Sequence, residues 1–284
     1  MIRKLLIVFA VLTSIFGTAS GTIGTGTILI AEKTDEKIVI DGKLDEDSWT
    51  KSEELIIRVQ DGGIGLVDVS LKALYDQEYL YLSAIWADPT ESTTKNLWTF
   101  NGSDWETSGD EDRIAFIWNI DDSISGFNIA GCAMLCHGDR MHTNAPDARG
   151  DLWHWKASRT NPAGYADDEW IDNSIVSGYS EEAKEAAMHG DGTLFPSEDT
   201  GYERNINSAE NGPKYRQPHP GDEEDGNFLL LKGVEAGAVV EITGDTSFNV
   251  GDTVAGYILN RPSESRGDVD AGGIWHDGRW TLEL

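Results

Sequence analysis

The chain has 284 residues, and its 50 acidic residues against 22 basic ones give a formal net charge of -28. A surface this negative argues against nucleic acid and anionic lipid as partners, because it would repel both. It suits a solvated acidic surface, divalent cations or a basic electron-transfer partner. The length is ample for one large β domain with its own core.

The first residues have the three-part layout of a secretory signal peptide. Arg3 and Lys4 precede an apolar run from Leu5 to Phe16, and small residues follow up to Gly21. The run is about twelve residues long, whereas a membrane span needs roughly twenty. We therefore predict that residues 1–21 are a cleaved leader, that the mature chain has no membrane span, and that the protein is periplasmic or extracellular.

The remainder of the chain is dominated by strand patterns, which are dense in apolar and aromatic residues. A short β run at 37–40 leads into an acidic stretch that ends at Trp49. Further strands are predicted at 54–60, in two parts of 68–88 joined by a turn around 76–78, and at 113–121, 227–234, 238–244, 253–259 and 278–284.

Between these two sets of strands, residues 122–227 are rich in Gly, Asp, Asn and Pro, and their one good helix signal lies at 181–189. We predict a single all-β domain over 22–284, with a loop-rich, partly helical insertion at about 122–227. The final residues read like the middle of a strand, which is typical of a chain that continues beyond Leu284.

The stretch GCAMLCHGDRMHTN (131–144) holds both cysteines, two of the six histidines and two of the four methionines. In an exported protein, Cys132 and Cys136 are candidates for a disulfide. A disulfide does not explain His137, however, because a histidine directly after the second of two cysteines is typical of covalent haem attachment. The usual spacing is C-x-x-C-H, and here it is one residue longer. We favour a haem site over a plain disulfide. Zinc ranks third, because the two cysteines and His137 fall within six residues and leave little room for a closed tetrahedral shell of ligands.

Residues near this stretch supply further candidates for a haem site. Met141, His142 and Lys156 are of types that bind iron axially, although a lysine on the surface is the alternative for Lys156. Trp153 and Trp155 would share one face of an extended segment, where they wall a haem pocket or pack in the core. Arg159 is a candidate to neutralise haem propionates.

Several segments together resemble the haem-binding domain of the ethylbenzene dehydrogenase gamma-subunit type, which also occurs in gamma subunits of related molybdenum enzymes. They are IVIDGKLDEDSW (38–49), ALYDQEYLYLSAIWADPTES (73–92), the run from 131 to 170 that contains DLWHWKA and GYADD, and GGIWHDGRWTLEL (272–284). The first of these is also shared by carbohydrate-binding modules of a related sandwich fold.

The resemblance implies an antiparallel β-sandwich with a haem held by loops at one end. In the gamma subunits the haem is b-type, with a methionine and a lysine as axial ligands, for which Met141 and Lys156 are this chain's candidates. The chain departs from that pattern in Cys132, Cys136 and His137, which predict c-type attachment with His137 as the proximal ligand and Met141 or else His142 opposite it.

Two classes of function follow. The first is an exported monohaem cytochrome that transfers electrons as a non-catalytic subunit or partner of an oxidoreductase. An enzyme with molybdenum and iron–sulfur centres is one candidate for that partner. The second is a secreted carbohydrate- or ligand-binding module, with a Cys132–Cys136 disulfide and with Trp98, Trp105 and Trp275 as stacking platforms.

Overall fold

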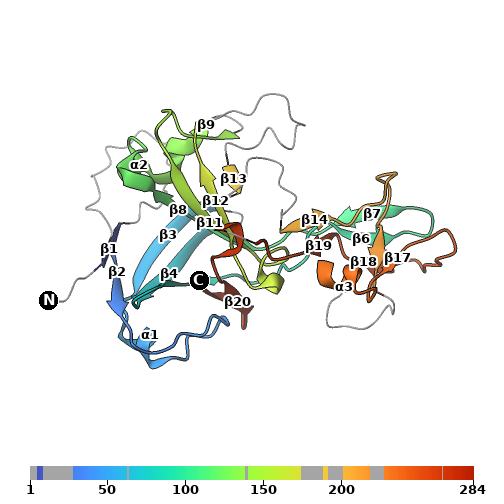
Figure 1. The fold of residues 1–284 in the computed structure, drawn as a ribbon, viewed down its shortest axis with the longest axis horizontal. Coiled ribbons are helices and arrows are strands. Elements are labelled where there is room, and N and C mark those ends of the chain that lie inside the picture. Colours follow the sequence, from blue (N-terminus) through green and yellow to red (C-terminus); the bar gives the residue numbers. More distant parts are fainter. Residues whose placement is uncertain are drawn as a thin grey trace.

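The computed structural model describes residues 5–8, 28–62, 64–137, 140–173, 188–190, 201–217, 227–263 and 265–284. Across these ranges strands predominate and helices are few and short, which confirms the predicted all-β class. No helix in these ranges is long and apolar enough to cross a membrane. Figure 1 shows a body that contains the two larger sheets and an arm that extends from it.

The larger sheet of the body has seven strands in the order β1-β2-β4-β5-β21-β20, and β3 pairs with the free part of β4. Its strands are β1 (Leu5–Val8), β2 (Ile28–Lys33), β3 (Leu55–Gly62), β4 (Gly65–Tyr75), β5 (Leu80–Ala87), β20 (Gly272–Trp275) and β21 (Arg279–Glu283). The strands predicted at 54–60, 68–88 and 278–284 are thereby confirmed. Strand β1 lies inside the predicted leader, so cleavage at Gly21 would leave β2 at the sheet edge.

The turn between β4 and β5 falls where the sequence predicts it. The carboxylate of Asp76 accepts hydrogen bonds from the backbone N–H groups of Glu78 and Tyr79, each at 2.7 Å. An aspartate that bonds backbone groups two and three residues ahead closes a tight turn. The hydroxyl of Tyr81 donates to the same side chain at 2.9 Å, so a single aspartate sets the register of the hairpin.

The second sheet has four strands, in the order β13-β12-β11-β8. They are β8 (Arg113–Asn119), β11 (Gly150–Lys156), β12 (Asp167–Ile171) and β13 (Met188–Gly190). Strand β8 confirms the prediction at 113–121, but β11 and β12 lie within the range predicted as an insertion, so that range builds part of the framework. The end of the helix predicted at 181–189 is strand instead, because Met188 and His189 pair with β12; the rest of it lies outside the described residues.

The two sheets share one hydrophobic core through three tryptophans. Trp155 of β11 has no exposed surface, and its ring centre lies 4.9 Å from that of Trp280 and 5.9 Å from that of Trp86, both in edge-on geometry. Trp86 and Trp280 are cross-strand partners on β5 and β21. The Trp155 indole N–H donates to Asn161 at 3.0 Å, so the polar atom of this core residue is satisfied.

A buried carboxylate joins the last strand, β21, to the segment at 41–49. Glu283 on β21 accepts hydrogen bonds from the backbone N–H of Gly42 at 2.9 Å, from that of Asp41 at 3.1 Å, and from the indole N–H of Trp49 at 3.0 Å. Trp49 lies in α1 (Asp47–Lys51). The β run predicted at 37–40 is wrong: this segment is irregular, and its place is set by these bonds to Glu283 rather than by a sheet ladder.

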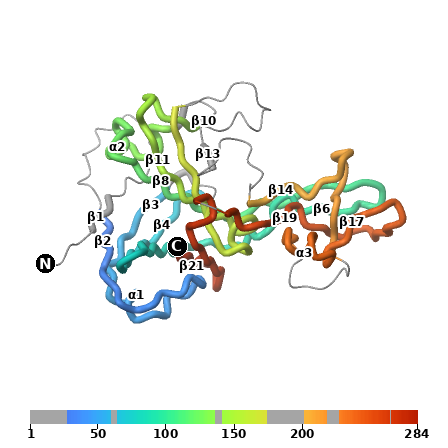
Figure 2. The backbone as a smooth tube through the Cα atoms, in the orientation of Figure 1, coloured from blue at the N-terminus to red at the C-terminus, as the bar shows by residue number. Residues whose placement is uncertain are grey.

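The arm is built from short strands and one helix, and it joins residues 97–108 to residues 201–263. Its elements are β6 (Leu97–Phe100), β7 (Trp105–Ser108), β14 (Tyr202–Arg204), β15 (Tyr215–Arg216), β16 (Leu229–Leu230), α3 (Leu231–Glu235), β17 (Val240–Glu241), β18 (Thr253–Val254) and β19 (Tyr257–Leu259). Figure 2 shows the same two stretches running side by side.

In the arm, three of the predicted strands differ from those observed. The one at 227–234 gives two strand residues and then α3, and the one at 238–244 shrinks to Val240–Glu241. The one at 253–259 is split at Gly256, where a Cβ atom would lie 2.2 Å from the carbonyl oxygen of Asn96. This close passage of two backbones requires glycine and interrupts the strand.

Burial raises the pKa of Glu283 to about 7, and this generates a pH prediction. An acid with a raised folded-state pKa binds its proton more tightly when folded, so its contribution to stability is complete below about pH 4.5 and is lost as pH rises towards 7. Relative to Glu283→Gln, which cannot titrate, we expect the wild type to lose about 1–3 kcal/mol of unfolding free energy across this window. Urea unfolding at a series of pH values measures the difference, and a difference that stays constant or grows with pH contradicts the assignment.

Candidate functional site

The segment rich in sulfur and histidine lies over the outer face of the four-stranded sheet, away from the shared core. It comprises α2 (Phe127–Ala130), a 3-10 turn (Gly131–Leu135) and a hairpin of β9 (Cys136–His137) and β10 (Arg140–Met141). Phe127 and Leu135 are buried in one cluster with Ile171 of β12, and Ile117 of β8 packs against it. Figure 1 shows α2 and β9 above the ends of these strands.

Sulfur atoms surround this cluster. Cys132, Met134 and Met141 are partly buried and pack against it. The Met134 thioether lies across Gly126, where an added Cβ would stand 3.1 Å from the methionine methyl carbon, and the φ of +81° at Gly126 also favours glycine. The segment therefore has a defined packing, with soft thioether groups at the border of its apolar cluster.

The hairpin sets the spacing of the predicted ligands. Cys136 lies opposite Met141, and His137 lies opposite Arg140. The backbone N–H of His142 donates to the carbonyl oxygen of Leu135 at 2.9 Å, which continues the pairing beyond the hairpin. The side chains of Cys136 and His137 are outside the described residues, so their roles as attachment point and proximal ligand stay predictions.

The imidazole of His142 is held by its own neighbour. Its Nδ1 lies 2.8 Å from the carbonyl oxygen of Thr143. Because a carbonyl oxygen only accepts, the proton is on Nδ1 and the lone pair of the neutral ring is on Nε2. Histidines that bind metals commonly donate their other ring N–H to a backbone carbonyl in this way. His142 thus has the tautomer that an Nε2 ligand requires.

Lys156 lies on the same outer face, farther along β11, and only 2% of its surface is exposed. The alternative of a surface lysine is therefore wrong. Its ammonium group forms an ion pair with Asp167, lies 3.5 Å from Glu169, and donates to the hydroxyl of Tyr202 at 3.1 Å. Arg266 approaches Asp167 from the other side at 3.2 Å.

The electrostatics of this network keep Lys156 protonated. Burial lowers the pKa of its ammonium group, but Asp167 and Glu169 outweigh that effect and hold the pKa above its ordinary value. Lys156 and Arg266 in turn hold the pKa of Asp167 below its usual range against the effect of burial. Lys156 therefore belongs to a buried ion network in this structure, and its role as an axial ligand stays a prediction. Burial, Lys156 and Arg159 hold the pKa of His154 well below its ordinary value.

Arg159, the predicted partner of haem propionates, already has a carboxylate partner. Its guanidinium lies 2.5 Å from Glu111, which also accepts the backbone N–H groups of Ser158 and Arg159 at 3.1 Å each. The guanidinium stands 4.7 Å above the ring of Tyr202. The sequence reasoning missed Glu111, Tyr202 and Arg266, because each is distant in sequence from Lys156 and no local pattern marks it.

The two tryptophans around His154 share one face, as the alternation predicts. Trp155 is a core residue, and Trp153 packs beside it, 5.0 Å from the ring of Trp118. Core packing accounts for Trp155, whereas its role as a wall of a haem pocket is a prediction that no contact here tests.

The three tryptophans predicted as exposed stacking platforms of a carbohydrate-binding module make contacts within the protein instead. Trp98 is 5% exposed and donates to the backbone of Asn205 at 2.8 Å, so its predicted exposure is wrong. Trp105 packs edge-on against Phe248 at 4.8 Å. Trp275 donates to the backbone of Asp88 at 3.0 Å.

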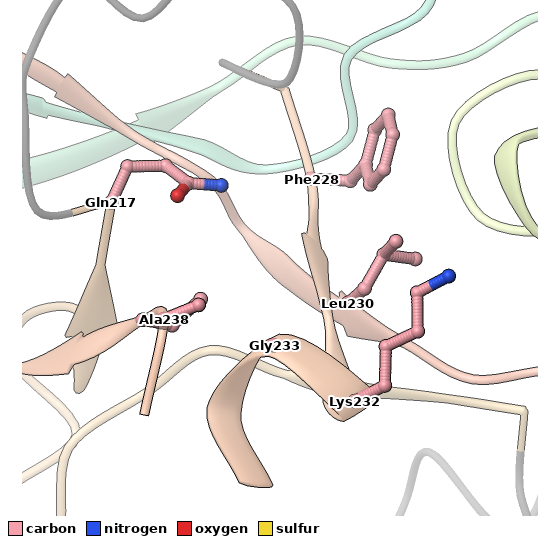
Figure 3. Close-up of a pocket in the computed structure, with 7 residues that line it drawn as sticks. Gln217, Phe228, Leu230, Lys232, Gly233 and Ala238 are labelled. Carbon is pink, nitrogen blue, oxygen red and sulfur yellow. The ribbon is translucent and has the colours of Figure 1, made fainter. Parts of the chain in front are cut away.

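A small cavity in the arm is a poor candidate for a ligand-binding site. Figure 3 shows Phe228, Leu230 and Lys232 at its lining, next to the first turn of α3. Its volume of about 170 Å³ is below the roughly 300–1,000 Å³ of typical ligand pockets. Within the described residues, no group of three or more histidine, cysteine and acidic side chains is placed to hold a metal ion.

Fold and site together define an all-β protein that carries thioether and imidazole groups on the outer face of a sheet. The family model described as ethylbenzene dehydrogenase matches residues 40–284. The chain therefore belongs to the ethylbenzene dehydrogenase family, which confirms the resemblance drawn from the sequence. No curated protein matches the chain in a sequence comparison.

The buried network predicts a large effect for one substitution. Lys156→Met leaves Asp167 and Glu169 buried with a single cation, Arg266, so we expect the free energy of unfolding to fall by about 3–5 kcal/mol in urea. Lys43→Met, which removes an exposed ion pair with Asp41, is the matched control and should cost less than about 1 kcal/mol. Equal effects of the two variants would show that the buried network does not stabilise the fold.

Proposed function

We propose that this protein is a haem-carrying, non-catalytic electron-transfer subunit or partner of an exported oxidoreductase of the ethylbenzene dehydrogenase kind. The observation that carries the proposal is the family match over residues 40–284. The packed segment of sulfur and histidine residues on the outer face of the second sheet supports it. We further propose that the two sheets form the β-sandwich of this family and that this segment is its haem loop.

In this proposal Cys132 and Cys136 attach the haem and His137 is the proximal ligand. The thioether of Met141 and the imidazole of His142 fit the donor types that haem iron accepts. The bond from His142 Nδ1 to Thr143 favours His142 as the second ligand over Met141, the first choice from sequence. Lys156 is not assigned as a ligand in this proposal, because its ammonium group pairs with the buried carboxylate of Asp167 and lies beside that of Glu169.

Bound haem supplies one-electron chemistry, and the chain's own residues hold it and shield it from water. The partner is another redox protein, for which an enzyme with molybdenum and iron–sulfur centres is our first candidate. Export through the leader at 1–21 places the protein in the periplasm or outside the cell, where covalent attachment through two cysteines keeps the cofactor on the chain.

The first test is the absorption spectrum of the protein exported from a host that matures c-type cytochromes, followed by acid–acetone extraction. We expect a reduced α-band and haem that stays on the polypeptide, because thioether bonds survive extraction. The control is Cys132→Ala/Cys136→Ala, which should release its haem or bind none. Extraction of haem from the wild type would replace covalent attachment by a b-type site. Absence of haem from both fractions would overturn the cytochrome proposal.

The second test separates the two candidate ligands. We expect His142→Ala to change the spectrum of the oxidised haem and its reduction potential, because it removes an axial nitrogen, while Met141→Ala leaves both near wild type. The opposite result assigns Met141 as the ligand. Thr143 contributes only its backbone oxygen to the His142 ring, so Thr143→Ser preserves this bond and serves as a control.

A further inference from the structure

A groove is lined by residues of both sheets of the body and of the loops beside them. Its volume is about 1130 Å³, and its lining comes from residues 34–40, the β4–β5 turn and the start of β5, strands β11 and β12, residues 268–270 and Leu284. Asp151 and Trp153 of β11 and Asp168 of β12 line it from the second sheet. Trp153 and Asp168 are cross-strand partners, so they share the face that is turned towards the first sheet.

The lining is far more acidic than the chain as a whole. Eight of its nineteen residues are acidic and one is basic, whereas 50 of the 284 residues of the chain are acidic. Asp35 and Asp270 are paired with Lys33 and Arg261 outside the lining. When these two pairs are set aside, Glu36, Asp76, Glu78 and Asp268 still outnumber the single lysine, Lys37, among the described residues of the lining, so the groove remains acidic.

This groove does not fit the haem of the proposed function. Among the described residues that line it there is no histidine, cysteine or methionine, and its carboxylates would repel the propionates. Its apolar part combines aliphatic side chains with three aromatic ones, Tyr79, Tyr81 and Trp153. Tyr79 is 62% exposed, and its ring centre lies 6.2 Å from that of Tyr81. Exposed tyrosines bordered by carboxylates attract ammonium and guanidinium groups through both charge and ring faces.

We propose that the groove is a docking site for a lysine- or arginine-rich segment of a partner protein. Its lining includes the exposed acids Glu78 and Asp268, which come from two separate segments of the chain, so a basic chain in the groove meets carboxylates from both segments. Tyr79 accepts the aliphatic stems and cationic heads of such side chains. A second copy of this chain is a poor occupant, because each copy carries a net charge of -28. The inference does not depend on the haem.

The test measures binding to the full chain by fluorescence anisotropy. The probe is a labelled peptide of about ten residues that alternates lysine and alanine, so that an extended backbone presents its charges on one face. We expect Glu78→Gln/Asp268→Asn to weaken binding by about 3- to 10-fold at low ionic strength, which corresponds to the usual worth of two partly exposed charges. For the wild type, binding should weaken when salt is raised to about 0.15 M.

The matched control is Glu210→Gln/Asp245→Asn, which removes the same charge from exposed positions of the arm, and it should change binding less than 2-fold, as roughly expected for distant screened charges. Tyr79→Ala is a second groove variant and should weaken binding without a change in charge. Equal losses in the groove and arm variants would overturn the proposal in favour of a general acidic surface. So would competition by spermidine at the affinity of the peptide, which would indicate a small-cation site.

Discussion

The fold depends on one strand that is buried on both of its faces. In β11 the side chains alternate between Trp155, which packs against the tryptophans of the opposite sheet, and His154 and Lys156, which face away from that core. A tryptophan supplies a large apolar surface at the contact of the two sheets. A buried lysine is tolerated only where nearby carboxylates neutralise its charge. Asp167 and Glu169 on the neighbouring strand provide these carboxylates.

This requirement connects the body to the rest of the molecule. Tyr202 begins β14 of the arm, and its hydroxyl meets both Lys156 and Asp167. Arg266 comes from the connection that returns from the arm to the last strands. Because these charges are buried, removal of any one of them leaves its partners with less opposite charge, so the network helps to hold the arm against the body.

The outer face of the second sheet is thus divided between two environments. One end is apolar and is covered by the sulfur-rich segment, while the other end is filled by the ion network. Lys156, although close in sequence to the sulfur-rich segment, lies at the end of this face that the ion network fills. A loop packed on a sheet has a rigid base, and such a base suits the cofactor site that we propose for the sulfur-rich segment.

The sequence by itself determined the all-β class, the hairpin of β4 and β5, the family and the sulfur-rich segment, because each rests on a local pattern or a short motif. Asp76 closes its turn with neighbours two and three residues away, so local reading succeeds there. Only the tertiary structure decided that 37–40 is irregular, that β11 and β12 belong to the framework, and that Lys156 is a buried ion-pair partner. Glu283, Tyr202 and Arg266 contribute to these outcomes, and their partners lie from 35 to more than 200 residues away. Spacing along a chain carries no information about such contacts.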